Sequence, residues 1–595
     1  METILSGKIK EAVRALYNCD IPDELAAVGD TRKDFKGDFT LVVFPLLKYS
    51  KCTPEKTAND IGEYLINNCA DVSGFNVVKG FLNLQISDKR WLNSLSEIAE
   101  SANLKDRFVA EHPQTILIEY SSPNTNKPLH LGHVRNNLLG FSLYRILSSC
   151  GHKVIKTNIV NDRGIHICKS MLAWQKFGDG ETPESSGIKG DHLVGKYYVL
   201  FEKKLKEEVT KLVKSGVSDV DARNQASLMK DTREMLLKWE SGDKEVVDLW
   251  KMMNSWVYAG FAETYKKLGV DFDIIYYESE TYMLGKKIVL DALDKKILYQ
   301  KDDSSIWADM TSDGLDQKLL LRSDGTAVYM TQDLGTAVER YNAYKFDRHI
   351  YVVGNEQNYH FDVLKSLLKK VGYNWSDGLF HFSYGMIELP DGKMKSREGT
   401  VVDADDLIQE MISTSRDVSL ELGKLSGFSE EEKEDIFRRI GLGALKYFIL
   451  KVDPKKNMTF NPSESIDFNG NTAPFIQYTY ARIKSLFRKA EQMEITENTQ
   501  LLSEAAIDEK EIALIKVLRK YPEIVKTAAD NFSPALIANY CYELAKEFNQ
   551  FYHDFSILGE EDSLKRNLRM TLARVTSESL HSGMWMLGIE MPERM

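Results

Sequence analysis

The chain has 595 residues, of which 43% are hydrophobic and 28% are charged. This composition is ordinary for a globular protein, and the length indicates three or four domains. The net charge of -11 argues against a protein that coats nucleic acid nonspecifically, although it is compatible with a locally basic groove and favours a cationic small substrate.

The six cysteines are widely spaced and form no C-x-x-C pair. Neither a disulfide framework nor a thiolate zinc site is therefore expected, and a reducing compartment fits best. The first residues are amphipathic and contain no long apolar segment, so we predict a cytoplasmic protein without a membrane anchor.

Residues 1–108 predict a small separate α/β domain. It begins with the amphipathic helix and continues through a strand-like run at Phe39–Phe44, a helical stretch at Pro54–Asn68 and the run Val77–Ile86. Nothing in this domain resembles a catalytic cluster.

Residues 109–402 alternate between strand and helix, which is typical of a parallel sheet. A strand at Gln114–Tyr120, a helix at Leu131–Ser149 and a strand at Lys153–Val160 form the first unit. The stretch from about 180 to 270 is largely helical, and we interpret it as an insertion of helical hairpins. The α/β alternation then resumes over the segments Gly285–Leu293, Ser305–Asp309, Lys318–Thr326 and His349–Gly354.

From about residue 403 the pattern is almost wholly helical, apart from a loop at Pro454–Pro474. We predict a helical connecting region over 403–460 and a helical C-terminal domain over 461–595. No internal repeat or low-complexity tract is found.

A polar loop, Pro123–His133, joins the predicted strand to the predicted helix. His130 and His133 are three residues apart and share a helix face, while Gly132 leaves room for a flat ring or a ribose against the backbone. A helix start with free N–H groups suits a nucleotide phosphate. The alternative is an ordinary capped helix, and a metal site would need a third ligand that no nearby spacing supplies.

A second polar loop, Gly385–Thr400, contains Lys393, Lys395 and Arg397 shortly before a helix capped by Asp403. Lysines in such a loop can stabilise the charge that develops on a pyrophosphate leaving group. Taken alone, the loop is equally well an ordinary solvated basic turn.

Together, His-Leu-Gly-His and Lys-Met-Lys-Ser resemble the two signatures of class I aminoacyl-tRNA synthetases. More closely, the chain resembles the arginyl-tRNA synthetases over nearly its full length. The segments that carry this resemblance are Glu119–Asn124, Val160–His166, Tyr329–Asp333, Gly354–His360, Pro474–Arg482 and Pro592–Met595. The resemblance implies a multidomain α/β fold, with a Rossmann-like catalytic domain and an all-α anticodon-binding domain.

The resemblance implies that Glu119 and Asp333 hold the guanidinium of arginine, and that Tyr329 packs beside it or forms a hydrogen bond with it. It also implies that Asn124 and Gln357 hold the amino and carboxylate end of arginine. Two carboxylates facing a planar fork of donors would reject lysine and citrulline, so no editing domain is needed. Singly, each residue has an ordinary structural alternative.

The second signature departs from the class pattern, because Lys395, Ser396 and Arg397 stand where Ser-Lys-Ser is expected after Lys393. Its second lysine has no counterpart, and the family suggests Lys127 as the substitute. The segment Asn161–Gly164 is left with two interpretations, a part of the substrate pocket or a turn with Arg163 in a structural ion pair.

The implied reaction activates arginine with ATP and Mg²⁺ and then transfers it to the 3′ end of tRNA(Arg), with no zinc and no protein nucleophile. His130, Gly132, His133, Lys127, Lys393, Lys395 and Ser396 form the expected ATP site. The resemblance also implies that activation requires bound tRNA.

For tRNA, the resemblance assigns the C-terminal domain to the anticodon and the N-terminal domain to the outer corner. Tyr478, Tyr480 and Arg482 are candidates for stacking on unpaired bases, although core packing suits the tyrosines equally. We expect a monomer. The alternatives are a nucleotidylyltransferase of the same superfamily with another acid substrate and a noncatalytic tRNA-binding relative.

Overall fold

The computed structural model describes residues 1–595 except 33, 101–107, 389–401, 422 and 424–426. The chain forms two compact units. One comprises residues 1–103, 486–520 and 546–577, and the other comprises residues 104–485, 521–545 and 578–595. Residues from the C-terminal helices contribute to both units.

The first unit contains a four-stranded antiparallel sheet of order β1-β2-β4-β3. Its N-terminal elements are α1 (Glu2–Tyr17), η1 (Asp23–Leu25), β1 (Val28–Asp30), β2 (Phe39–Val42), η2 (Phe44–Leu46), α2 (Leu47–Ser50), α3 (Pro54–Asn68), β3 (Val72–Val78), β4 (Phe81–Ile86) and α4 (Asp88–Glu100). Helix α3 matches its predicted bounds. The run Val77–Ile86 is the turn and second strand of a hairpin.

Helices from the far end of the sequence belong to the same unit, namely η8 (Thr499–Glu504) and α20 (Glu509–Arg519). Arg519 forms an ion pair with Glu2 at 2.5 Å, and the buried Arg569 pairs with Glu511 at 2.8 Å. These pairs connect parts of the unit that are far apart in the sequence.

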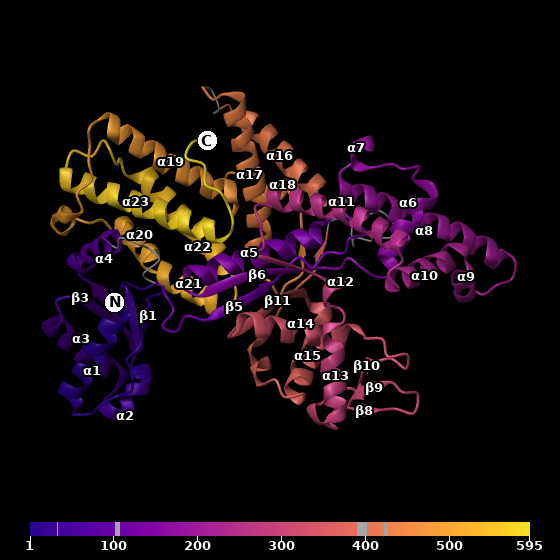
Figure 1. Ribbon diagram of the computed structural model, residues 1–595. Helices are drawn as coiled ribbons and strands as arrows, with labels where there is room; N and C mark the ends of the chain where they lie inside the picture. The colour runs from indigo at the N-terminus through magenta and orange to yellow at the C-terminus, as the bar shows by residue number, and fades with distance from the viewer. Residues whose placement is uncertain (33, 101–107, 389–401, 422, 424–426) are drawn as a thin grey trace. The chain divides into compact units, whose positions relative to one another are not determined.

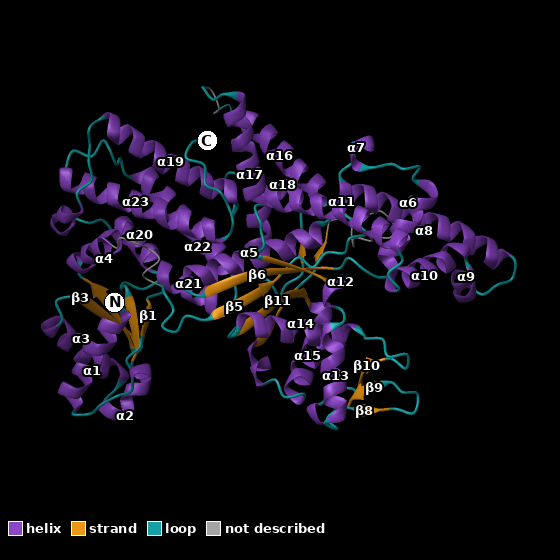
Figure 2. Ribbon diagram, viewed as in Figure 1, coloured by secondary structure: helices purple, strands orange, loops and turns teal. Residues whose placement is uncertain are grey.

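The second unit is built on a five-stranded parallel sheet of order β12-β11-β5-β6-β7. Its strands are β5 (Thr115–Glu119), β6 (Lys153–Val160), β7 (Ile274–Tyr277), β11 (Arg348–Gly354) and β12 (Leu379–Tyr384), and helices lie along the sheet (Figure 2). The predicted parallel sheet is confirmed. The strand order reverses beside β5, and in such sheets ligands bind at the carboxyl ends of the strands at this point.

Helix α5 (Leu131–Ser149) follows β5 and has its predicted bounds. It is buried nearly all round, and even the polar side chains of Arg135 and Asn137 are 0% exposed. The next helix, α6 (Ile165–Phe177), follows β6.

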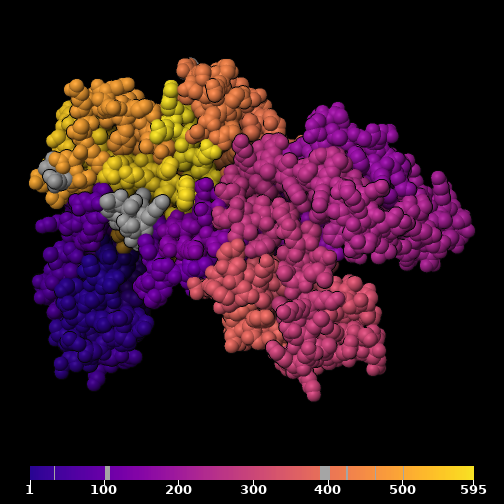
Figure 3. All heavy atoms as spheres, viewed as in Figure 1, coloured from indigo at the N-terminus to yellow at the C-terminus, as the bar shows by residue number. Residues whose placement is uncertain are grey.

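The predicted insertion is helical, as expected. Its helices are α7 (Pro183–Ser186), α8 (Gly190–Lys214), α9 (Asp219–Gln225), α10 (Ser227–Glu240) and α11 (Lys244–Leu268). Atoms in the purple to magenta part of the colour bar gather at the right of the space-filling view (Figure 3).

The segments Ser305–Asp309 and Lys318–Thr326 do not continue the parallel sheet, which corrects that expectation. The strands β8 (Tyr299–Gln300), β9 (Ile306–Ala308) and β10 (Lys318–Leu321) form a separate antiparallel sheet. Their connections are too short for the crossover that parallel pairing needs. The neighbouring elements are α12 (Glu278–Thr281), α13 (Leu284–Asp294), η4 (Thr311–Asp313), α14 (Tyr329–Tyr344), η5 (Asn355–Gln357), α15 (Asn358–Lys370) and η6 (Asn374–Gly378).

The remaining described elements are mainly helical, as predicted. They are β13 (Ile387–Glu388), α16 (Ala404–Glu421), α17 (Glu430–Leu450), β14 (Met458–Thr459), α18 (Pro462–Ser465), α19 (Ala473–Gln492), α21 (Tyr521–Asp530), α22 (Pro534–Asp554) and α23 (Ser563–Met586). Among the described residues, no helix combines the length and apolar character needed to cross a membrane.

Candidate active site

The loops after β5 and β6 pair with each other at the carboxyl edge of the parallel sheet. Asn124 and Asn161 form an isolated parallel bridge, in which the Thr125 N–H donates to the Asn161 carbonyl at 3.0 Å. The N–H of Asn161 donates to the Pro123 carbonyl at 2.9 Å. This pairing fixes the polar loop where a ligand crevice is expected.

The two histidines cap the start of helix α5. The His130 N–H donates to Nδ1 of His133, and the Gly132 N–H donates to Nδ1 of His130, both at 3.1 Å. Because each Nδ1 accepts a hydrogen bond, each ring is held as the neutral tautomer with its proton on Nε2. Each ring can therefore donate from Nε2 to a ligand.

Burial and the nearby charge of Lys127 favour the neutral form of both rings. Burial lowers the pKa of His130 to about 3, with Lys127 adding to the effect. Burial also lowers the pKa of His133 well below its ordinary value, with further contributions from His130 and Lys127. The ring centroids are 3.9 Å apart, so the two rings present one surface.

Gly132 stands where a side chain would collide with this cap. A Cβ built at Gly132 would lie 3.0 Å from Cε1 of His130. The glycine therefore lets the His130 ring lie against the first turn, in addition to leaving the backbone open to a ligand.

A cavity of about 370 Å³ lies beside these residues. Its walls are Lys127, Pro128, Leu129 and His130 from the polar loop, His192, Gly195, Lys196, Tyr198 and Val199 from helix α8, and Asp403 before helix α16. Lys127 is half-buried and its pKa is lowered by burial, and no described residue forms an ion pair with it. An anion in this cavity would be matched by that lysine.

Lys393, Lys395 and Ser396 lie in 389–401, outside the described residues. The chain enters that stretch from β13, and Arg135 of α5 donates to the Met386 carbonyl at 3.1 Å. It returns at Val402, whose carbonyl accepts from the Leu131 N–H at 3.0 Å. Both flanks of the lysine stretch are therefore held by helix α5.

Arg135 also donates to the carbonyls of Pro454 and Lys456, at 3.1 and 2.8 Å. Since β13 pairs with β14 in the same region, a single guanidinium holds the base of the lysine stretch. Burial lowers the pKa of Arg135 to about 10.

The predicted arginine-binding residues lie at or after the ends of β5 and β11 and in the first turns of helix α14. Tyr329 is 74% exposed at the start of α14, and Asp333 follows one turn later. Nε2 of His360 lies 2.6 Å from Oδ2 of Asp333. Asn124 and Gln357 are exposed, Asn124 after β5 and Gln357 after β11.

Glu119 is placed differently from the other predicted residues. It is 6% exposed, and its carboxylate forms an ion pair with Arg340, which is 1% exposed. Burial raises the pKa of Glu119, while the Arg340 charge opposes that shift. The charge of Glu119 is thus already balanced within the protein.

Glu278, the first residue of α12, was missed by the sequence reasoning. Burial raises its pKa to about 7, the charge of Arg163 opposes the shift, and the charges of Asp162 and Asp333 add to it. Glu278 therefore lies within electrostatic reach of Asp333. Its position at the carboxyl end of a strand, where Glu119 also lies, was the available signal.

Side chains of the Asn161–Gly164 segment form polar contacts within the protein. The Asp162 carboxylate accepts from the Tyr258 hydroxyl at 2.9 Å and from the Ser279 hydroxyl at 2.7 Å. Arg163 pairs with Glu240 at 3.3 Å, as the structural alternative predicted.

The three candidates for tRNA contact lie on helix α19. Tyr480 is 5% exposed and packs on His581, with ring centroids 5.8 Å apart, which fits the core-packing alternative. The guanidinium of Arg482 lies 4.8 Å from the centre of the half-buried Tyr478 ring.

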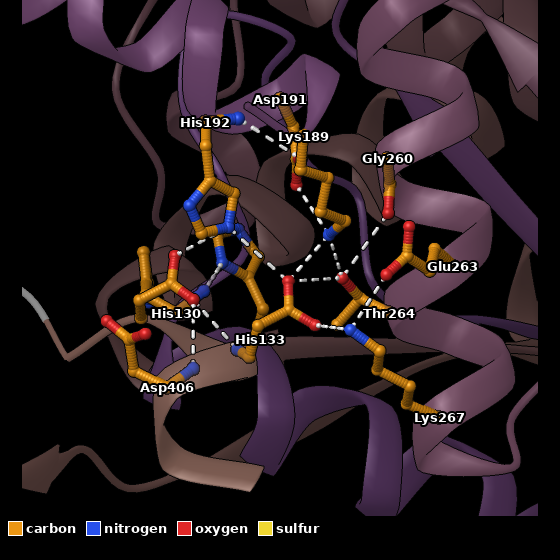
Figure 4. A network of polar contacts seen from close by, with 12 residues as sticks. His130, His133, Lys189, Asp191, His192, Gly260, Glu263, Thr264, Lys267 and Asp406 are labelled. Carbon is orange, nitrogen blue, oxygen red and sulfur yellow. Dashed lines mark hydrogen bonds and ion pairs between the residues drawn. The ribbon is translucent and has the colours of Figure 1, made fainter. Parts of the chain in front are cut away.

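A polar network joins the insertion to the start of α16 (Figure 4). Asp405 bonds Lys189 at 2.6 Å and Lys267 at 3.1 Å. Possible ligand atoms of Asp191, His192 and Asp405 lie within 4.8 Å of one another. The two lysines already supply positive charge there, so we assign no metal to this group.

Comparison with known proteins matches two family models. Residues 95–461 match the model described as tRNA synthetases class I (R), catalytic domain. Residues 476–595 match the DALR anticodon binding domain.

Full-length relatives carry the same activity in their names. The arginine–tRNA ligase of Parabacteroides distasonis is 60% identical and that of Bacteroides thetaiotaomicron is 57% identical, each covering 100% of both chains. Among solved structures, the arginyl-tRNA synthetase of Thermus thermophilus has a TM-score of 0.77 at 24% identity, covering 100% of both chains. That of Plasmodium falciparum has a TM-score of 0.75 at 20% identity, covering 100% of this chain and 99% of that one.

Proposed function

The chain belongs to the class I arginyl-tRNA synthetases, and from this membership we propose which of its residues carry out the reaction. It is an arginine–tRNA ligase that uses ATP, arginine and tRNA. One observation carries the assignment of residues. The polar loop and both flanks of the lysine stretch meet at the start of helix α5, beside a cavity with an uncompensated lysine.

In the activation step, the arginine carboxylate attacks the α-phosphorus of ATP, and the bond to the pyrophosphate oxygen breaks. The Nε2–H groups of His130 and His133 donate hydrogen bonds to the phosphate oxygens on which negative charge develops. Lys127 supplies the cation that the irregular second signature lacks. It acts together with Lys393 and Lys395 of that signature. Mg²⁺ accompanies ATP on its phosphates, and neither zinc nor a protein nucleophile takes part.

For the guanidinium of arginine, we assign Asp333 and Glu278 as the two carboxylates, with Tyr329 beside them. This revises the expected role of Glu119, whose charge is matched by Arg340. The Glu119–Arg340 pair instead supports the floor of the pocket. Binding of a guanidinium would favour the ionised form of Glu278, since an adjacent positive charge opposes the burial that raises its pKa.

At the other end of the substrate, Asn124 and Gln357 are exposed at adjacent strand ends and are available for the amino and carboxylate groups. In the transfer step, a terminal ribose hydroxyl of tRNA(Arg) attacks the arginyl carbonyl and AMP leaves. The C-terminal helices, with Tyr478 and Arg482, bind the anticodon side of the tRNA, and the N-terminal domain binds its outer corner. The protein works as a cytoplasmic monomer, and activation requires tRNA.

The test is ATP–pyrophosphate exchange across amino acids, with and without tRNA. The wild-type protein is expected to exchange only with arginine. Asp333→Ala should lower kcat/KM for arginine by at least about 100-fold, because a charge-assisted contact to the guanidinium is lost, while tRNA binding is retained. Glu339→Gln, which removes an exposed acid from the same helix, serves as the control. Normal charging by Asp333→Ala would overturn the pocket assignment.

A further inference from the structure

The wall of the cavity opposite the polar loop carries His192, near the start of helix α8. Its Nε2 lies 3.4 Å from Oδ2 of Asp403 and 3.4 Å from Oδ2 of Asp405. The side chain is 30% exposed and lines the same cavity as Lys127 and His130. An imidazole between two carboxylates is in a position to hold a proton.

Asp403 has two roles at this place. Its Oδ1 accepts from the N–H groups of Asp405 at 2.8 Å and Asp406 at 3.3 Å, which caps the start of α16. Its backbone forms a bridge with His130, so its carboxylate lies directly at the cavity wall. A bare carboxylate there would repel any polyphosphate.

The neighbouring acids already have other partners. Asp405 is bonded by Lys189 and Lys267, and it also accepts from the Thr264 hydroxyl at 3.1 Å. Asp191, which is 0% exposed, pairs with Lys189 at 3.2 Å. Figure 4 shows these lysines grouped around the insertion side of the network. Within the described part of the chain, the cation that contacts Asp403 is His192.

We propose that protonated His192 is the counter-ion of Asp403 and thereby allows the phosphates of ATP and pyrophosphate to occupy the cavity. His192 is therefore a positioning residue, which acts through the charge of Asp403. This inference rests on the proposed function, since it concerns the same phosphate site.

Charged groups from each neighbouring element bear on His192. Its hydrogen bond to Asp405 and the charges of Asp403 and Asp191 raise its pKa, while burial and Lys189 oppose them. Across the cavity stand Lys127 and the neutral His130. A proton held in this way is lost as pH rises through the raised pKa, so phosphate affinity should fall in the alkaline direction.

The test compares the KM for pyrophosphate of the full-length variants in exchange with arginine and tRNA. His192→Gln should raise this KM about 10- to 100-fold, because one unit charge close to a phosphate is uncompensated. The KM for arginine should stay unchanged. Lys203→Gln, which removes an exposed charge from the same helix, should behave as wild type.

The double variant His192→Gln/Asp403→Asn gives the sharper result. Asparagine caps a helix as well as aspartate does, so the substitution removes the charge and keeps the cap. Pyrophosphate KM should return to within about threefold of wild type, since only the electrostatic repulsion is removed. A merely structural role of His192 would give no such rescue.

The pH dependence separates His192 from Lys127. Wild-type KM for pyrophosphate should rise with pH over the range where His192 loses its proton, and this rise should be absent in His192→Gln and in Asp403→Asn. An unchanged KM in His192→Gln, or failure of Asp403→Asn to rescue it, would overturn the inference. If His192→Gln does not fold, the single variant Asp403→Asn still tests the inference. A KM for pyrophosphate that still rises with pH in this variant would overturn the inference. Absence of arginine-dependent exchange in the wild type would instead refute the proposed function.

Discussion

Replacement of Arg340 by methionine would expose the cost of a buried, unmatched carboxylate. Arg340 and Glu119 have side chains only 1% and 8% exposed, and they neutralise each other. Removing one partner of such a pair costs about 3–5 kcal/mol, whereas replacing both by groups of similar size is often nearly neutral. Arg340→Met should therefore be strongly destabilising, and Glu119→Gln/Arg340→Met should recover most of the loss.

The penalty of Arg340→Met should depend on pH. Burial raises the pKa of Glu119, and the variant lacks the charge that opposes this shift. For a carboxyl group with a raised pKa in the folded state, stability is highest below its unfolded pKa of about 4.3 and is lost as pH rises through the folded pKa. The loss of stability of the variant relative to wild type should thus be larger at pH 8 than at pH 5.5.

Hydrogen exchange measured on peptides from β5 and α14 reports this local stability. A loss of 3–5 kcal/mol corresponds to exchange faster by a factor of about 10² to 4 × 10³ in these elements. Equal protection in Arg340→Met and wild type at pH 8 would refute the reasoning. A double variant Glu119→Gln/Arg340→Met with no more protection than Arg340→Met would refute it as well.

Two further changes test the geometry around helix α5, and a third tests helix α1. Gly132→Ala would place a Cβ 3.0 Å from the His130 ring. Displacement of the ring should lower the kcat of exchange by about tenfold or more. A kcat equal to that of wild type would contradict the cap geometry. Gly7→Ala, in helix α1 with nothing within 4 Å of the added Cβ, should instead raise stability by about 0.5–1 kcal/mol in thermal unfolding, and a loss would show that α1 is not helical there. Arg135→Lys keeps the positive charge but removes the planar guanidinium that donates to three carbonyls beside the lysine stretch. The exchange kcat should therefore fall, with little change in KM for arginine. An unchanged kcat would show that the lysine stretch is positioned without Arg135.

Elements with a strong local pattern were predicted closely. Helix α5, strand β6 and helix α3 have the bounds expected from periodicity and stop residues. The helical insertion also matched, because its apolar positions recur at helical spacing. The short strands β9 and β10 were assigned to the wrong sheet, since a strand of three or four residues does not itself specify its partner.

The site was predictable as far as its chemistry lies in contiguous motifs. The two histidines and Gly132 were singled out from one stretch of sequence, and Lys127 was suggested by the family resemblance. The paired histidine cap follows from the spacing of the histidines on a helix. The N-cap hydrogen bonds that keep both rings neutral are also local, since they join residues two and three positions apart.

The state of each carboxylate required the fold. Glu119 is 221 positions before its partner Arg340, and Glu278 comes within electrostatic reach of Asp333 only in the folded sheet, where β7 lies beside β6. His192 likewise meets Asp403 across the junction between the insertion and helix α16. Whether a buried acid is available to a substrate depends on the charges packed against it, and those charges come from segments that are remote in sequence. Residue types and spacing therefore identified the family and its loops, while packing revealed which charges are already paired within the protein.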